Sequence, residues 1–92
     1  MGREPRTPRE RAVAFLAAYE RPGAGPYERH VVSIARRWLR IMASRRATQG
    51  AVNHLLAEFD EPRPVGYGCA WEDLQKHIVR WATDEGWLEP EG

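Results

Sequence analysis

Residues 27–44 constrain the fold more than any other part of this chain. On a helix at about 100° per residue, their apolar side chains gather on one broad side and their arginines on the other. The apolar side holds Val31, Val32, Ile34, Ala35, Trp38, Leu39, Ile41 and Met42, and the polar side holds Arg29, Ser33, Arg36, Arg37 and Arg40. The pattern predicts a long central helix that ends near Ser44, with one face in the core and a nearly pure arginine face outside it.

The preceding residues predict a first helix with a well-specified start. Thr7 supplies an N-cap hydroxyl, Pro8 suits the first helical position, and Glu10 can bond back to the cap. The run AVAFLAAY at residues 12–19 is apolar on almost every side. We therefore expect this helix to be buried against more than one neighbour or against a second copy of the chain, so a homodimer through the first helix is one expectation.

Two further helices are predicted downstream. The third begins at the N-cap Thr48, and the fourth opens at Trp71 and stops at Gly86. Residues 60–69 are rich in proline and glycine and are expected to form a loop, with a short strand at 65–67 as an alternative. The core positions expected on these helices are Val52, Leu55, Leu56 and Phe59, then Trp71, Leu74, Ile78, Trp81 and Ala82.

These patterns predict one all-α domain over residues 1–92. It is a small four-helix domain with a long central second helix, and a helix-turn-helix-like arrangement is one option. We expect flexible tails at 1–6 and 89–92. No apolar run approaches the roughly 20 residues of a membrane span, the N-terminus lacks the apolar segment of a signal peptide, and Cys69 is a lone cysteine. A cytoplasmic location with no membrane contact is therefore expected.

Charge is divided unevenly along the chain. The net charge is +1, but residues 1–46 hold eleven Arg against four acidic residues, whereas residues 47–92 hold three basic against nine acidic residues. This polarity favours a basic surface with a polyanionic or acidic partner. The alternative is that the two halves pair with each other across the fold.

Catalytic motifs are not apparent. His30, His54 and His77 fall on three different predicted helices, and none is spaced with another His, Cys or carboxylate as in a metal-binding motif. The glycines have no phosphate-binding context. A meeting of Cys69 with a histidine in the fold is the one catalytic arrangement left open. We therefore expect a non-enzymatic protein without cofactor or metal.

The arginines favour nucleic-acid binding instead. An arginine stripe along one helix face, continued in the turn that follows, can make several phosphate contacts, each of which adds salt-dependent affinity. The predicted phosphate-contacting residues are Arg29, Arg36, Arg37, Arg40, Arg45 and Arg46. Guanidinium groups also bind carboxylates and stack on aromatic rings, so the same stripe suits an acidic protein surface.

Residues 34–56 resemble part of the winged helix-turn-helix regulators of the MarR and ArsR type. In that family the second helix often carries an Ile-Ala-Arg-Arg stretch like residues 34–37, and small polar residues at the start of the third helix face DNA bases. The interval from this stretch to the third helix is several residues longer here, and another helix stands in place of the wing. The base-facing candidates that the resemblance implies are Thr48, Gln49, Asn53 and His54.

A protein-interaction module is the alternative function. Arg, Trp and Tyr dominate interface hot spots, and the chain combines an arginine face with an apolar first helix and four Trp. Tyr67 and Trp87 are the expected exposed aromatic contacts, whereas Trp38, Trp71 and Trp81 are expected in the core. In size the chain is similar to phage or mobile-element proteins that inhibit or adapt a host protein complex through an acidic or aromatic surface.

Overall fold

The apolar patterns fold into helices close to where the sequence predicts them. The structure is a computed structural model that describes residues 7–60 and 68–88. Its elements are α1 (Pro8–Tyr19), α2 (Pro26–Ala43), α3 (Gln49–Leu56), the short 3-10 helix η1 (Ala57–Phe59) and α4 (Gly68–Asp84). Within these described ranges there is no strand. The predicted all-α fold with four α-helices, of which the second is the longest, is confirmed.

Helix α1 begins at the predicted cap. The side-chain oxygen of Thr7 accepts a hydrogen bond from the backbone N–H of Glu10 at 3.1 Å. The Thr7 hydroxyl also donates to the Glu10 carboxylate at 3.1 Å, so Glu10 bonds back to the cap residue as predicted. The carboxylate lies beside the positive end of the helix dipole, so the start of α1 is stabilised by both the cap and the dipole.

The second helix ends near its predicted limit, whereas the third begins at its predicted cap but ends before Phe59, which the sequence places on it. Helix α2 stops at Ala43, one residue before the predicted end, with Ser44 as its C-cap. Thr48 caps α3 by accepting a hydrogen bond from the backbone N–H of Ala51 at 3.1 Å. Helix α3 has only eight residues, after which the chain tightens into η1.

Helix α4 starts three residues before the predicted Trp71, at Gly68. Ala70 is only 5% exposed, and its packing in the core supports the extra turn. The helix ends in a Schellman motif, because Trp87 N–H donates to the Ala82 carbonyl at 2.7 Å and Gly86 N–H donates to the Thr83 carbonyl at 3.2 Å. Gly86 has a φ of +84°, the left-handed conformation that this motif requires.

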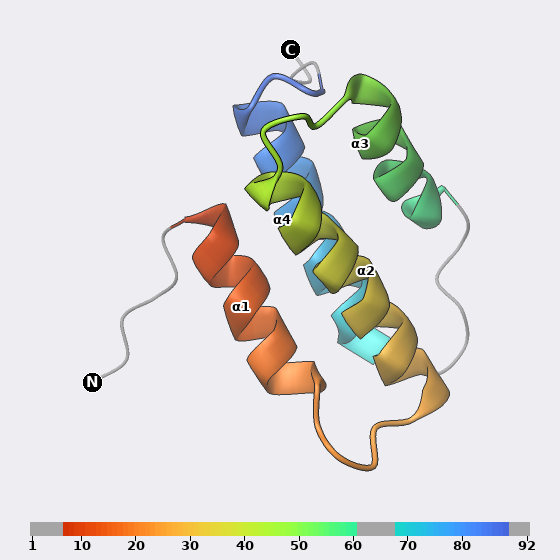
Figure 1. Cartoon of the computed structure of the whole chain (residues 1–92). Coiled ribbons are helices and arrows are strands. Elements are labelled where there is room, and N and C mark those ends of the chain that lie inside the picture. Colours follow the sequence, from red (N-terminus) through yellow and green to blue (C-terminus); the bar gives the residue numbers. More distant parts are fainter. Residues whose placement is uncertain (1–6, 61–67, 89–92) are drawn as a thin grey trace.

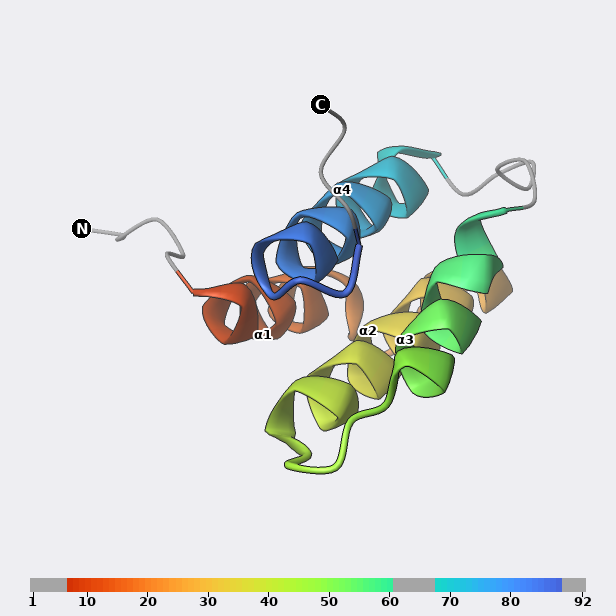
Figure 2. The ribbon, with the colours of Figure 1, turned by 90° about the horizontal axis from the view of Figure 1, so that it is seen from above.

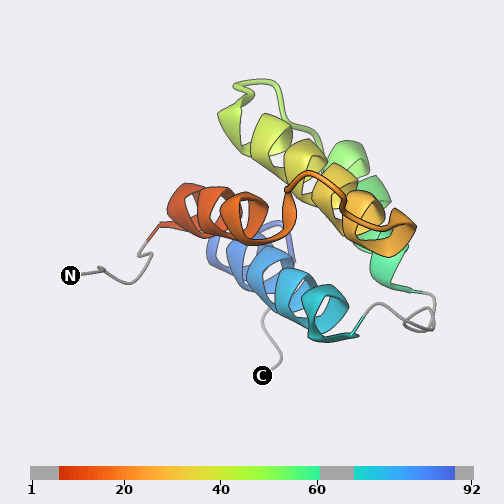
Figure 3. The same ribbon diagram turned by 90° about the horizontal axis from the view of Figure 1, so that it is seen from below.

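The helices run alternately up and down (Figure 1), so that one end of the molecule gathers the start of α1, the end of α2, the start of α3 and the end of α4. Helix α2 packs against each of the other three α-helices. Figure 2 shows α1 and α3 on opposite sides of α2, and Figure 3 shows α1 and α4 side by side. The predicted central position of the second helix is therefore the observed one.

The core is built on the apolar side of α2 and the stripe of α4. Trp38 has no exposed surface, and its ring meets that of Trp81 edge to face at a centroid distance of 6.3 Å. Phe59 packs in the same way on Trp71, at 5.0 Å. The other fully buried large side chains are Ile34, Leu55, Leu74, Ile78, Val31 and Val52. The three tryptophans predicted to be in the core are therefore buried.

Helix α1 is buried against two neighbours, α2 and α4, as its composition predicts. Ala12 and Phe15 enter the core. The opposite side of the helix stays open, because Val13 is 50% exposed and Ala14, Ala17 and Ala18 are exposed as well. The two neighbours therefore account for only part of the apolar surface of α1.

No helix in residues 7–60 and 68–88 is both long and apolar enough to span a bilayer. The predicted tails at 1–6 and 89–92 lie outside the described residues. The alternative strand at 65–67 and Tyr67 also lie outside them.

Candidate nucleic-acid interface

The arginine face of α2 divides into residues that are paired and residues that are not. Arg36 makes an ion pair with Glu20, at the C-cap of α1. Arg37 is half-buried, and its Nη1 donates to the Glu58 carboxylate in η1 at 2.7 Å. These two ion pairs hold α2 to its neighbours, so both guanidinium groups are partly neutralised before any ligand arrives.

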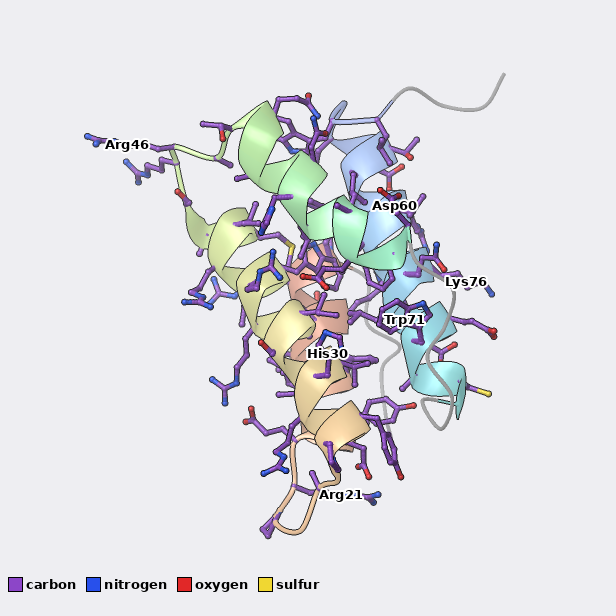
Figure 4. The ribbon with its side chains drawn as sticks, turned by 90° about the vertical axis from the view of Figure 1, so that its right-hand side faces the viewer. Arg21, His30, Arg46, Asp60, Trp71 and Lys76 are labelled. Atoms are coloured by element: carbon purple, nitrogen blue, oxygen red, sulfur yellow. The ribbon has the colours of Figure 1, made fainter. Side chains whose placement is uncertain are left out.

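Glu58 is the acidic centre of the contact between α2 and η1. The hydrogen bond from Arg37 lowers the pKa of the Glu58 carboxyl below its usual value, and the positive charge of the same Arg37 adds to this effect. His30 Nε2 lies 3.7 Å from the other carboxylate oxygen. Figure 4 shows His30 facing the side of the molecule that carries Trp71, and the two rings are 6.0 Å apart.

The pairing between the two halves of the chain is therefore partial. Arg37 and Glu58 join the basic half to the acidic half. The pairs Arg36–Glu20 and Arg21–Glu28 lie within the basic half. Internal pairing consequently leaves part of the positive charge of the first half on the surface.

The uncompensated positive charge gathers at the connection between α2 and α3. Arg40, Arg45 and Arg46 are all exposed, and within residues 7–60 and 68–88 none of them forms an ion pair. Figure 4 shows Arg46 projecting away from the body of the molecule at this connection. We call the group Arg40, Arg45 and Arg46 the basic corner. Arg29, the remaining arginine of the predicted stripe, is exposed near the opposite end of α2.

A groove of about 400 Å³ lies beside the basic corner. Its cationic and polar lining comes from Arg37, Arg40, Ser44, Arg46 and His54. Its apolar lining comes from Ile41, Ala47 and Ala51. The groove thus combines donors suited to an anion with an apolar surface suited to the uncharged part of the same ligand.

The residues at the start of α3 are largely occupied by contacts within the chain. The Gln49 amide Nε2 donates to the Asn53 side-chain oxygen at 2.9 Å and to the Trp87 backbone carbonyl at 3.0 Å. Thr48 accepts the capping hydrogen bond of α3. Of the four base-facing candidates that the resemblance implies, only His54 lines the groove.

The order of α2 and α3 sets the shape of the basic corner. Residues 44–48 connect the two helices, and α3 then runs back beside the second half of α2 (Figure 1). In a helix-turn-helix the two helices instead meet at about 90–120° through a turn of 3–4 residues. The basic corner and the groove beside it are the candidate binding features of this connection.

Trp87 lies beside the same connection, although it is 38 residues after Gln49 in the sequence. Trp87 is half-buried, packs against the core cluster and lines a second hollow, of about 310 Å³, with Met42 and Trp81. The sequence predicts Trp87 as an exposed contact but gives no sign that it meets the end of α2. The sequence does not reveal that Glu20 and Glu58 pair with arginines of α2, because neither glutamate lies on the same element as its arginine partner.

The described residues offer no cluster of metal-binding side chains. In residues 7–60 and 68–88, no group of three or more His, Cys, Asp or Glu side chains could hold a metal ion. Cys69 is a free, exposed cysteine in the first turn of α4. His77 sits on the half-buried side of α4, where burial and the nearby charge of Arg11 lower its pKa.

The fold and this surface define a small all-α globular domain with a basic corner between its second and third helices. No protein-family model, curated protein or solved structure matches the chain. The resemblance to helix-turn-helix regulators therefore stays a prediction.

Proposed function

We propose that this protein binds nucleic acid through the basic corner and contacts chiefly the phosphate backbone. The observation that carries the proposal is that Arg40, Arg45 and Arg46 are exposed together and lack ion-pair partners in the described part of the chain. Three uncompensated cations in one place attract a polyanion and release its counterions on contact. Each guanidinium can also hold a phosphate through two parallel hydrogen bonds.

Hydrogen bonds at the start of α3 favour contact with the phosphate backbone over recognition of bases. Specific base recognition by glutamine or asparagine needs a free amide that can pair in a bidentate way. The Gln49 amide already donates to Asn53 and to the Trp87 carbonyl. Contacts to phosphate position a protein on nucleic acid without reading its sequence, so we expect weak sequence preference.

The test is the salt dependence of binding, measured by fluorescence anisotropy with a labelled oligonucleotide from low to moderate salt. The triple variant Arg40→Gln, Arg45→Gln, Arg46→Gln should reduce the slope of log K against log salt concentration by about 2 to 3, since each lost phosphate contact removes about 0.7 to 0.9. It should also weaken binding strongly at low salt.

The control removes the same charge elsewhere. Arg29, Lys76 and Arg80 are exposed on the first turns of α2 and on α4, and Arg29→Gln, Lys76→Gln, Arg80→Gln lowers the net charge equally. This variant should keep most of the slope. If the native protein binds no nucleic acid at low salt, or if the control loses as much affinity as the corner variant, the proposal is wrong.

The open side of α1 favours protein contact as a second candidate function. Val13, Ala14, Ala17 and Ala18 form an exposed apolar strip, which is the part of α1 that α2 and α4 do not cover. A second copy of this chain is the simplest partner with the same strip. Sedimentation velocity should then show a dimer that Val13→Glu dissociates, whereas a monomer across the micromolar range rejects the homodimer.

A further inference from the structure

The groove at the basic corner lies next to the second hollow. Ile41, Ser44 and Ala47 line both of them, so the two hollows lie on either side of one ridge at the end of α2. The second hollow is also lined by the start of α1 and by residues at the end of α4. Figure 2 shows these three helix ends drawn together on one side of the molecule. A ligand that crosses this ridge can therefore contact both hollows.

The two hollows differ in chemistry. The groove is lined by Arg40, Arg46 and Arg37, of which Arg37 pairs with Glu58, and among the residues that the structure describes no carboxylate lines it. The charged residues that line the second hollow are Arg9 and Glu85, which have opposite signs, and its other walls include Met42 and two tryptophans. Anionic groups are therefore favoured in the groove, and a flat uncharged group is favoured in the hollow.

Trp87 is the side chain in the hollow with a ring available to a ligand. Trp81 is only 5% exposed because its ring is used in the core, whereas Trp87 is half-buried. Both backbone polar groups of Trp87 are hydrogen-bonded. Its N–H donates to the Ala82 carbonyl at 2.7 Å, and its carbonyl accepts from Gln49 Nε2 at 3.0 Å. The backbone that carries the ring is therefore held in place, and the side chain is partly buried against the core cluster.

We infer that the nucleic acid bound at the basic corner is single-stranded, with phosphates on the arginines of the groove and a neighbouring base stacked on Trp87 across the ridge. The inference rests on the proposed function. A single strand has a flexible backbone and exposed base faces, and proteins that bind such strands combine a basic groove with aromatic rings on which bases stack. A duplex keeps its bases stacked inside and must extrude one before it can reach an aromatic ring.

This arrangement also agrees with the occupied side-chain amide of Gln49 at the start of α3. Stacking accepts every base, because each has a π face, and needs no hydrogen-bond readout. The engagement of Gln49 by Asn53 and by Trp87 therefore does not weaken this mode of binding. In this mode Gln49 is a positioning residue, which holds the Trp87 segment against α3.

The experiment measures binding of the native protein at low salt to a labelled oligothymidylate of about 12 nucleotides and to a duplex of the same length. This length is within the site sizes of single-strand binders. We expect the single strand to bind more tightly. Intrinsic tryptophan fluorescence should fall on addition of the single strand, and Trp87 should be the source because Trp38, Trp71 and Trp81 are at most 5% exposed.

Two substitutions separate stacking from packing. Trp87→Leu keeps an apolar side chain against the core but has no ring, so it should weaken single-strand binding about tenfold, remove the fluorescence change and leave duplex binding nearly unaltered. Trp87→Phe should recover most of the affinity. Circular dichroism and thermal melting establish that both variants are folded.

The outcomes distinguish this inference from the proposed function. If duplex binds as tightly as the single strand, or if folded Trp87→Leu binds the single strand with native affinity, the inference is overturned while phosphate binding at the corner stands. If Trp87→Leu does not fold, the native preference and the fluorescence change decide. If the native protein binds neither oligonucleotide, the proposed function fails. Equal competition by polyglutamate overturns the inference too, because it shows contact through charge alone.

Discussion

Trp38 offers the sharpest test of the packing around α2. Its side chain has no exposed surface, and its ring meets Trp81 edge to face at 6.3 Å. The indole N–H is also buried and has no hydrogen-bond partner among the described residues. The residue therefore combines a large stabilising burial with a polar group whose desolvation is not offset.

The size of the effect follows from that environment. Replacing a fully buried tryptophan with alanine costs about 3–5 kcal/mol, from the lost transfer free energy and the cavity that remains. A domain of 92 residues has a free energy of unfolding of about 5–14 kcal/mol. Trp38→Ala should thus remove a large share of the stability and lower the melting temperature by at least about 12 °C.

Trp38→Phe should behave very differently. Phenylalanine keeps an aromatic ring beside Trp81 and removes the buried N–H, whose unsatisfied state costs about 1–3 kcal/mol. That relief opposes the loss of contacts from the smaller ring, so the net destabilisation should stay below about 1.5 kcal/mol.

Urea unfolding followed by far-ultraviolet circular dichroism measures both variants against the native protein. Val13→Ala is the matched control, because Val13 is 50% exposed and its truncation should change stability by no more than about 0.5 kcal/mol. If Trp38→Ala lowers the free energy of unfolding by less than about 1 kcal/mol, the burial of this ring in the core is refuted. Equal costs for the alanine and phenylalanine variants would contradict the stabilising effect expected from removing the unsatisfied indole N–H.

Four further predictions concern caps and titrating groups. Thr7→Ala removes the cap of α1 and should cost about 1 kcal/mol in thermal unfolding; an unchanged melting temperature would contradict the cap. Gly86→Ala has room for its methyl group but must adopt a φ of +84°, so it should cost about 1–2 kcal/mol, read from the urea midpoint. The pKa of His77 is lowered in the fold, so the folded state resists protonation, and stability should fall as pH drops below the ordinary value of 6.5; His77→Gln should flatten this part of the pH profile, and a native profile that is already flat there would reject the assignment. The pKa of Glu58 is also lowered, so its contribution is present above the ordinary value of 4.5 and is lost as pH falls through the folded-state pKa. Glu58→Gln should remove that acid sensitivity and, by releasing Arg37 in the groove, tighten oligonucleotide binding at neutral pH, whereas weaker binding would show that the ion pair is needed to position Arg37.

The positions of the helices are decided by local chemistry, which is why they can be read from the chain. The 3.6-residue period of residues 27–44 fixes both faces of α2, and a threonine cap fixes the start of α1 and of α3. The Gly86 stop of α4 follows from the need for a left-handed residue. The sequence predicts too late a start for α4 because its first turn has no cap signal, and the buried Ala70 supports that turn through packing.

Which arginines form ion pairs could not be predicted from the sequence in the same way. The period of α2 places Arg36, Arg37 and Arg40 on one face, yet the first two meet carboxylates 16 and 21 residues away in sequence and the third does not. An ion pair of this kind depends on which elements pack together, and that is set by burial of the apolar faces.

The same physical reason governs the candidate site. The sequence established an arginine-rich helix face and a basic turn after it, because both are properties of one continuous segment. The packing of α3 and the end of α4 beside the end of α2 brought Trp87 to within hydrogen-bond reach of Gln49 and left Arg40, Arg45 and Arg46 exposed. Contacts between distant segments form only when the whole core is buried, so the groove, the ridge and the second hollow are properties of the folded chain.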